Sequence, residues 1–376
     1  MEDGFATSTD GTGADGAEAD LASWLGRLAE AGGSDLHVKV GSPPLIRERG
    51  QLRRLDRPPL TPEETEAIAR AIVPESRRAR FDERGEVDFA YSLPGVGRFR
   101  VNAFRQRGSC SLVLRQLRIG GPEIESVGLP PIVRQLAEEP RGLVLVTGPT
   151  GSGKTTTLAA MIEHINRTRP VHIVTIEDPI EVLHPDQEAS VNQREVGQDT
   201  ESFLSAIRAA LRQDPDVILI GEMRDTETVR AALQAAETGH LVLSTLHTVD
   251  ATETVNRVVD FFPAEQQHQI RVTLAASLRG IISQRLVPST RDDLVPAVEV
   301  LVNTGRVAER IIESDATSEI PEVIAQGGYY GMQTFDQALL VLVRDGSVSV
   351  EDALESATEP HDFQLMLQQA GITPAA

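Results

Sequence analysis

Residues 142–155 read GLVLVTGPTGSGKT, an apolar run followed directly by a loop rich in glycine. The loop matches the pattern G-x-x-x-x-G-K-[ST] and lies between a predicted strand ending at Thr147 and a predicted helix beginning near Thr155. Backbone N–H groups of such a loop, with the positive end of the helix, form a cradle for phosphate. The alternative is a glycine turn that matches this pattern by chance, which is expected on the order of once in a thousand. The stretch therefore predicts a nucleotide-binding site.

Within this loop the chemistry of each position can be assigned. Lys154 is expected to reach the outer phosphates of ATP, and the Thr155 hydroxyl is expected to bind Mg²⁺. The predicted nucleotide-binding residues are Gly148, Pro149, Thr150, Gly151, Ser152, Gly153, Lys154, Thr155 and Thr156.

Around the loop, short apolar runs alternate with amphipathic stretches, which is typical of a parallel sheet wrapped by helices. The predicted strands are Gly142–Thr147, His172–Ile176, Val217–Ile220 and Leu241–Thr245, and the predicted helices are Thr155–Asn166, Glu201–Arg212, Thr226–Ala236 and Thr252–Phe261. Beyond Pro263 we expect mostly helix, including 334–344 and 350–357, with one strand over Ala297–Val302. The fold class is therefore α/β, with a helical C-terminal region.

The chain before this region has a different pattern. Residues 21–118 predict a mixed α/β domain, with helices over 21–31 and 61–72 and strands within 35–55, 87–91 and 98–117. Gly120-Gly121-Pro122 interrupts the pattern, so we expect a linker over 119–125 and a second domain over 126–376. Residues 1–20 are acidic, without Lys or Arg, and are predicted to form a disordered tail rather than a signal peptide.

The carboxyl ends of the parallel strands are where ligands bind in such a sheet. Glu177, Glu222 and His247 follow three of the predicted strands and should meet the phosphate loop there. Asp216 precedes its strand and is therefore expected at the opposite edge, as a capping residue. We expect Glu222 to take the carboxylate role in the Mg²⁺ shell and to activate the attacking water. Glu177 is expected to support Mg²⁺ or the water, and His247 to sense the γ-phosphate. The alternative for each carboxylate is a solvated strand end paired with an arginine.

Five arginines of the first domain form the remaining candidate group, and they are Arg98, Arg100, Arg105, Arg107 and Arg115. Their alternation along predicted strands is typical of a solvated face. The sharper hypothesis is that some act in trans at a subunit interface, stabilising the charge of the transition state.

Composition limits the partners. The net charge of −20 repels phosphate backbones, so we expect no nucleic-acid partner. No apolar run is long enough to span a bilayer. Cys110 is the only cysteine, which excludes an intramolecular disulfide and a cysteine-based zinc site. A reducing compartment, the cytoplasm, is the expected location.

Longer stretches resemble a known family. Residues 175–181 (TIEDPIE), 218–225 (ILIGEMRD) and 238–248 (TGHLVLSTLHT) look like the Asp box, Walker B motif and His box of secretion ATPases. Supporting stretches are 34–37 (SDLH), 99–104 (FRVNAF), 191–196 (VNQREV) and 331–334 (GMQT). The resemblance covers about Leu21 to Phe363 and is strongest to the retraction ATPases of type IV pili.

That resemblance implies a homo-hexamer of subunits with a PAS-like N-terminal domain and a RecA-like ATPase domain. The ring would sit on the cytoplasmic face of an inner-membrane platform protein and drive pilin back into the membrane. Nucleotide would lie between the domains, with Arg100, Arg105 and Arg115 completing the sites. The family commonly carries a helix reading AIRNLIRE, whereas residues 306–313 here read RVAERIIE. This departure leaves ATPase activity untouched and bears on its coupling to retraction.

Three other functions remain open from the sequence. One is a pilus-assembly or type II secretion ATPase, although many of those relatives carry a tetracysteine zinc module that this chain lacks. The others are a RecA-like nucleic-acid translocase and a nucleotide-binding scaffold without turnover.

Overall fold

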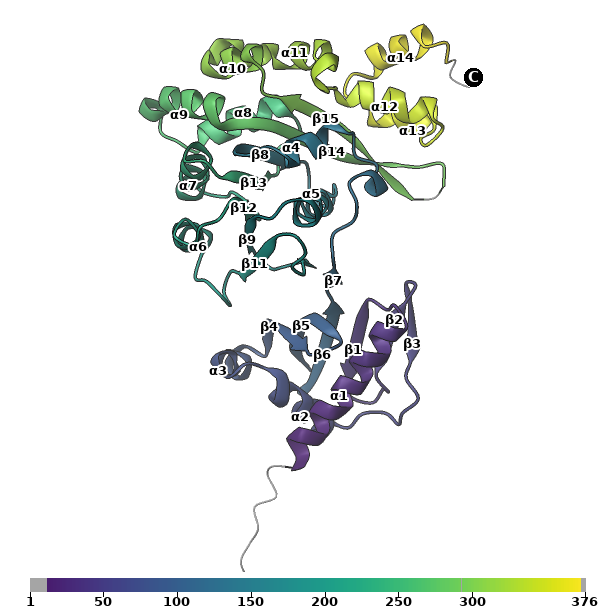
Figure 1. Ribbon diagram of the computed structural model, residues 1–376. Coiled ribbons are helices and arrows are strands. Elements are labelled where there is room, and N and C mark those ends of the chain that lie inside the picture. The colour runs from purple at the N-terminus through teal and green to yellow at the C-terminus, as the bar shows by residue number, and fades with distance from the viewer. Residues whose placement is uncertain (1–11, 292, 373–376) are drawn as a thin grey trace, which may run out of the picture. The chain divides into compact units, whose positions relative to one another are not determined.

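The computed structural model describes residues 12–291 and 293–372 (Figure 1). By its internal contacts the chain divides into two compact units, Met1–Ile119 and Gly120–Ala376. Each unit has its own hydrophobic core and is described separately.

The N-terminal unit is one antiparallel sheet with helices on one face. Its sheet has the strand order β3-β2-β1-β6-β5-β4. The elements are α1 (Thr12–Glu30), β1 (Asp35–Lys39), β2 (Leu45–Glu48), β3 (Gln51–Arg54), α2 (Pro62–Ile72), α3 (Glu75–Arg84), β4 (Glu86–Leu93), β5 (Gly97–Gln106), β6 (Ser109–Gln116) and β7 (Arg118–Ile119). Alternate residues of β5, such as Phe99 and Val101, are buried in the core with residues of α1 and α2.

The prediction of a disordered tail over residues 1–20 is wrong for residues 12–20. Only residues 1–11 of the expected disordered tail lie outside the described residues, and residues 12–20 are the first turns of α1. Ala17 packs against the core of the unit, Tyr91 donates a hydrogen bond to Glu18 (3.4 Å), and Asp20 pairs with Arg57 (3.2 Å). These contacts hold in place a segment whose composition alone suggested a solvated chain.

The helices α2 and α3 show what local sequence can reveal. Helix α2 begins after Thr61, as predicted, with a capping box in which Thr61 and Glu64 satisfy each other's backbone N–H groups. Helix α3 was missed because Phe81 is its only buried residue, so it has no apolar periodicity to detect.

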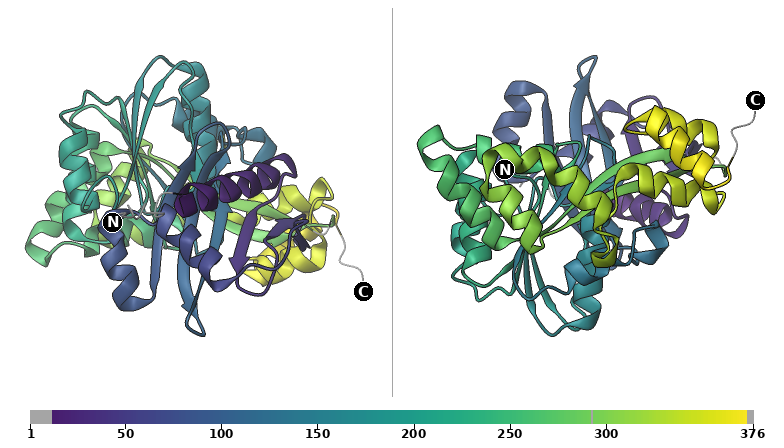
Figure 2. Two further views of the ribbon diagram at one scale, coloured as in Figure 1. Left: turned by 90° about the horizontal axis from the view of Figure 1, so that it is seen from below. Right: turned by 90° about the horizontal axis from the view of Figure 1, so that it is seen from above.

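The C-terminal unit is a seven-stranded sheet covered on both faces (Figure 2). Its strand order is β11-β9-β12-β13-β8-β14-β15, parallel from β11 to β14 and antiparallel between β14 and β15. The strands of this sheet are β8 (Gly142–Thr147), β9 (His172–Glu177), β11 (Ser190–Glu195), β12 (Val217–Ile220), β13 (Leu241–Leu246), β14 (Leu278–Pro288) and β15 (Leu294–Val302). Strand β10 (Val182–Leu183) lies outside it.

The helices of this unit fall into three groups. Helices α4 (Ile132–Ala137) and α5 (Lys154–Thr168) cover one face of the sheet. The other face carries α6 (Phe203–Ala210), α7 (Thr226–Glu237), α8 (Ala251–Asp260), α9 (Ala264–Ser277), α10 (Gly305–Ile312) and α11 (Ile320–Gln326). Helices α12 (Phe335–Arg344), α13 (Val350–Ser356) and α14 (Pro360–Gln369) form a separate core around the outer ends of β14 and β15. Short 3-10 turns cover Glu125–Val127, Ser314–Glu319 and Gly328–Tyr330.

Two strands of this sheet were not predicted. Strand β14 lies where mostly helix was expected, next to β8, and its polar residues Ser283 and Gln284 are fully buried. Strand β11 is an edge strand whose exposed and polar side chains hide a strand pattern. In both cases tertiary contacts decide the structure against the local signal.

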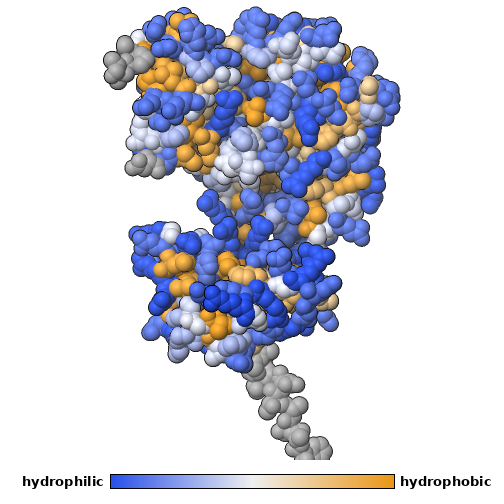
Figure 3. All heavy atoms as spheres, turned by 180° about the vertical axis from the view of Figure 1, so that it is seen from behind, coloured by the Kyte–Doolittle hydropathy of each residue, from blue (hydrophilic) through white to orange (hydrophobic). Residues whose placement is uncertain are grey.

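The surface is mostly polar on the face drawn in Figure 3. Within the described residues, helices of sufficient length and apolar character to cross a membrane are absent.

Candidate active site

The phosphate loop joins the central strand β8 to helix α5. Gly148 has φ +141°, and a Cβ there would lie 2.4 Å from the carbonyl oxygen of Gln284, so only glycine fits. Gly153 precedes α5 with φ +91°, another conformation that side chains disfavour. The Oγ of Ser152 is buried in the loop and has no hydrogen-bond partner among the described residues. A tight backbone cradle with an unsatisfied hydroxyl fits a bound phosphate.

Lys154 is held inside this loop. Its side chain is buried, and Nζ donates hydrogen bonds to the carbonyl oxygens of Gly148 (2.8 Å) and Pro149 (2.9 Å). Burial lowers the pKa of the ammonium, and the negative charge of Glu222 partly offsets that effect. The ammonium is therefore held within the loop, where phosphate oxygens could replace the two carbonyl oxygens as its hydrogen-bond acceptors.

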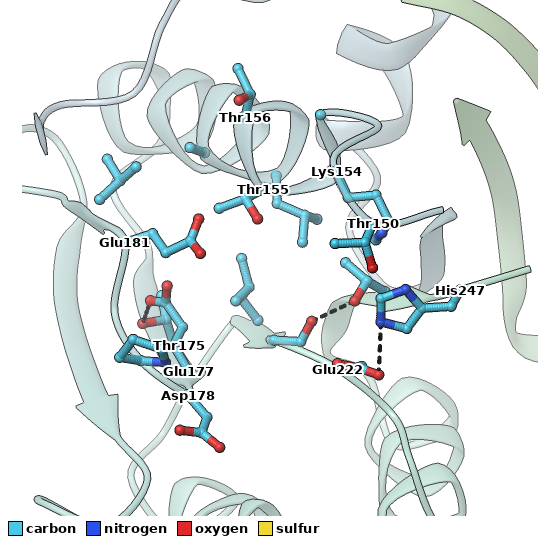
Figure 4. Close-up of a pocket in the computed structure, with 18 of the residues that line it drawn as sticks. Thr150, Lys154, Thr155, Thr156, Thr175, Glu177, Asp178, Glu181, Glu222 and His247 are labelled. Carbon is cyan, nitrogen blue, oxygen red and sulfur yellow. Dashed lines mark hydrogen bonds and ion pairs between the residues drawn. The ribbon is translucent and has the colours of Figure 1, made fainter. Parts of the chain in front are cut away.

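A cavity of about 720 Å³ opens in front of the loop. Its lining brings together most of the residues predicted from the sequence, from the loop and from the ends of β9, β12 and β13 (Figure 4). These are Thr150, Gly151, Gly153, Lys154, Thr155, Thr156, Glu177, Glu222 and His247. The lining also includes Asp178, Glu181 and Arg224.

Glu222 is held by two basic side chains at this edge. One carboxylate oxygen lies 3.0 Å from Nε2 of His247, and the other lies 2.7 Å from a guanidinium nitrogen of Arg224. Burial alone raises the pKa of Glu222, but the hydrogen bond from Arg224 and the charge of His247 bring it below its ordinary value. The hydroxyl of Thr245 donates to the carbonyl oxygen of Gly221 (2.6 Å) and fixes the backbone before Glu222. The site thus contains an ionised, oriented carboxylate.

Glu177 is in a different situation. Its carboxylate accepts hydrogen bonds from the Thr175 hydroxyl (2.6 Å), from the Gln193 amide (3.2 Å) and from the Glu181 backbone. Burial raises its pKa despite these donors. Much of its hydrogen-bonding capacity is therefore used within the protein.

Glu181 was missed from the sequence. It follows β9 by four residues, and Figure 4 shows its side chain pointing into the cavity, toward Thr155. The signal was present in the stretch TIEDPIE, whose last carboxylate lies just beyond the strand end that was examined. Oxygen ligands from Thr155, Glu181 and Glu222 line the same cavity and suit Mg²⁺.

Asp216 lies at the opposite edge of the sheet, as expected. It precedes β12, and its carboxylate accepts a hydrogen bond from the backbone N–H of His172 at the start of β9 (2.8 Å). It joins two strand starts and is remote from the phosphate loop.

A second cavity, of about 780 Å³, adjoins the first at the start of α5. Gly153, Thr156 and Leu286 line both cavities, and the second also includes Leu129 and Pro296. Its mixed apolar and polar lining beside the start of α5 was not foreseen.

The three arginines predicted to act in trans lie on β5 and β6. Arg105 pairs with both carboxylate oxygens of Glu66 (3.1 Å each), and Arg115 pairs with Asp35 (2.8 Å). Arg100 lies directly opposite Arg115 in the sheet, is exposed, and has no ion-pair partner in the described part of the chain.

The helix that departs from the family pattern is α10. Arg310 pairs with Glu319 (2.7 Å), and Arg306 donates to Gln326 (3.2 Å). Val307 and Ile311 are buried, so the apolar spacing of this helix serves the core.

Comparisons with known proteins identify the family to which this chain belongs. Residues 50–360 match the family described as "Type II/IV secretion system protein". The chain belongs to that family. The chain is 46% identical over 344 residues to the "Type IV pilus retractation ATPase PilT" of Pseudomonas aeruginosa, a match covering 92% of this chain and 100% of the relative. It is 47% identical over 316 residues to the "Twitching motility protein" of Neisseria gonorrhoeae, covering 84% of each.

Solved structures agree. A crystal structure of the pilus retraction motor PilT with bound ADP matches with a TM-score of 0.82 and 47% identity, covering 91% of this chain and 98% of that chain. The Legionella pneumophila ATPase DotB matches with a TM-score of 0.71 and 27% identity, covering 93% and 96%. The predicted fold class and the predicted resemblance are confirmed, and the chain is an ATPase of the secretion family.

Proposed function

We propose that this ATPase is a motor that hydrolyses ATP to retract type IV pili and so supports twitching motility. The observation that carries the proposal is the near full-length match to a relative named for pilus retraction. A relative named for pilus assembly, TfpB of Acinetobacter baylyi, is 39% identical over 60% of this chain and 33% of its own length. Retraction is therefore favoured over assembly.

The site supports a division of labour in hydrolysis. The loop N–H groups and Lys154 hold the phosphates, and Mg²⁺ would neutralise charge on the outer phosphates when bound. Thr155 and Glu181 hold the metal side of the cavity, with Glu222 beside them. Glu222 orients and deprotonates the attacking water, and His247 holds Glu222 while contacting the γ-phosphate. Glu177, at the end of β9, supports the bound Mg²⁺ or the attacking water.

The base of the nucleotide is assigned to the second cavity. Gly153 and Thr156 lie at the boundary between the two cavities, so a nucleotide with its phosphates in the first can extend its base into the second. Apolar lining such as Leu129 and Leu286 suits a planar base.

The working unit is proposed to be a hexamer bound at the cytoplasmic face of the inner membrane, on a platform protein. Arg100, with Arg105 and Arg115, would complete a site of a neighbouring subunit. Arg100 supports this most directly, because it is exposed and has no ion pair within the described chain. No nucleic-acid partner is proposed, given the net charge of −20.

Gene deletion tests the direction of the motor. Loss of a retraction ATPase leaves cells with more surface pili that no longer shorten, and restoring the wild-type chain should reverse both changes. Cells without pili after deletion would instead identify an assembly ATPase. ATPase stimulation by added DNA would support a translocase.

A further inference from the structure

Strand β11 uses its polar side chains to hold the segment that follows β9. Gln193 donates from Nε2 to the carbonyl oxygen of Val182 (2.8 Å), and its Oε1 accepts from the backbone N–H of His184 (2.8 Å). Two residues further along the same face, Glu195 accepts from the backbone N–H of Ile180 (3.4 Å). Residues 180–184, which include Glu181, are thus held to the sheet edge at β11 by these side chains.

The same Gln193 amide also contacts one active-site carboxylate, that of Glu177. Its Nε2 donates to Glu177 (3.2 Å), on the oxygen that also accepts from Thr175. The two donors and the acceptor of the amide are therefore all engaged, and the contacts fix which end is nitrogen. One side chain therefore links Glu177 with the backbone on both sides of Leu183, just beyond Glu181.

We propose that Gln193 is a positioning residue of the ATPase: it holds the 180–184 segment so that Glu181 faces Thr155 across the phosphate cavity. This inference rests on the site proposed above. Gln193 does not itself line the cavity, so it acts through Glu177 and Glu181.

The chemistry of the amide makes the role specific. A glutamate at 193 has nearly the same shape but lacks the Nε2 donors, so it would set a carboxylate against the Val182 carbonyl and Glu177. The phosphate loop, on β8 and α5, makes none of these contacts. Loss of the amide should therefore impair turnover and Mg²⁺ use much more than binding of the nucleotide phosphates.

The test compares Gln193→Glu with a matched control in the full-length chain. Asn192→Asp makes the same amide-to-acid change one residue earlier, where the exposed side chain contacts His172 (2.8 Å) at the remote edge of the sheet. Turnover, half-saturating Mg²⁺, and the Kd of a fluorescent ADP analogue in EDTA are measured for each. Lys154→Ala is included to check the proposed site itself.

For Gln193→Glu we expect a loss of kcat of about tenfold or more, a raised Mg²⁺ requirement, and a metal-free Kd within threefold of wild type. Asn192→Asp should match wild type in all three. Turnover by Gln193→Glu within twofold of Asn192→Asp, or an equal loss of metal-free nucleotide affinity, would overturn the inference. Full turnover by Lys154→Ala would instead overturn the site. If Gln193→Glu does not fold, Gln193→Met preserves the volume and gives the same comparison.

Discussion

The strand-end edge of the C-terminal unit and the arginine-bearing sheet of the N-terminal unit organise charge in opposite ways. At the strand ends, Lys154 from the phosphate loop and Glu222 and His247 from the ends of β12 and β13 converge on one cavity. On the N-terminal sheet, Arg105 and Arg115 are paired with carboxylates of their own unit, and Arg100 is exposed. The first region is assembled within one unit of the chain, whereas the role proposed for the second requires contact with a neighbouring subunit.

Of the substitutions that test this comparison, Lys154→Ala should cause the largest loss of turnover. Removal of the ammonium that the loop holds in place should lower kcat/KM by on the order of 10²–10³-fold, because no other cation in the loop can replace it. Phosphate-release assays measure the loss. Arg212→Ala, an exposed arginine of the same unit, is the control and should retain wild-type turnover.

The buried carboxylate of Glu299 predicts how the stability of the C-terminal unit depends on pH. Glu299 on β15 is buried and accepts a hydrogen bond from the Ala251 N–H at the start of α8 (2.8 Å). Burial raises its pKa from 4.5 to about 7, with the nearby charges of Asp250 and Asp336 adding to the effect. The folded chain therefore binds more protons than the unfolded chain between these values, and stability should fall as pH rises from 4.5 to about 7.

Glu299→Gln keeps the acceptor and removes the titration. The variant should not show the loss of stability with rising pH, which in the wild type is on the order of 3 kcal/mol at most. Urea unfolding at pH 5 and pH 8 measures it, and Glu309→Gln, on the exposed face of α10, is the control. An identical pH dependence in wild type and Glu299→Gln would refute the prediction.

Arg100→Ala tests whether the N-terminal sheet acts between chains. Because the side chain is exposed and has no ion-pair partner in the described residues, its loss should leave Tm unchanged. If it acts in trans, turnover of the assembled protein should drop by about tenfold or more. Turnover equal to wild type would remove Arg100 from the mechanism.

Arg115→Ala should cause a small loss of stability, which would distinguish it from Arg100→Ala. Asp35 is buried and would lose its 2.8 Å partner, but Arg47 remains 3.9 Å away. Because the Arg115 side chain is 69% exposed, the cost should be only about 1 kcal/mol, read as a lowered Tm. A Tm equal to that of Arg100→Ala would show that this ion pair contributes nothing.

Sequence reasoning succeeded where local patterns and tertiary structure agree. The boundaries of β8, β12 and α2 were predicted because apolar runs and the Thr61 cap define them locally. It failed at β14, whose buried Ser283 makes sense only beside β8, where Thr147 donates to its hydroxyl (3.0 Å). It also failed at α3, which buries a single side chain.

The candidate site shows the same limit. The rule that ligands lie at strand ends brought Glu222 and His247 into the cavity but stopped short of Glu181. One of the hydrogen bonds that occupy Glu177 comes from Gln193 on β11, a strand whose polar residues gave no strand pattern. The contrast between Glu177 and Glu181 could therefore be seen only in the structure.

The central claim, that this strand-end edge is the hydrolytic centre, is tested most directly by ATP binding and turnover of Glu222→Gln. The amide keeps the shape of the side chain but cannot accept a proton from water. We predict ATP affinity within threefold of wild type and a kcat reduced by about 10²-fold or more. Turnover equal to wild type would contradict the account.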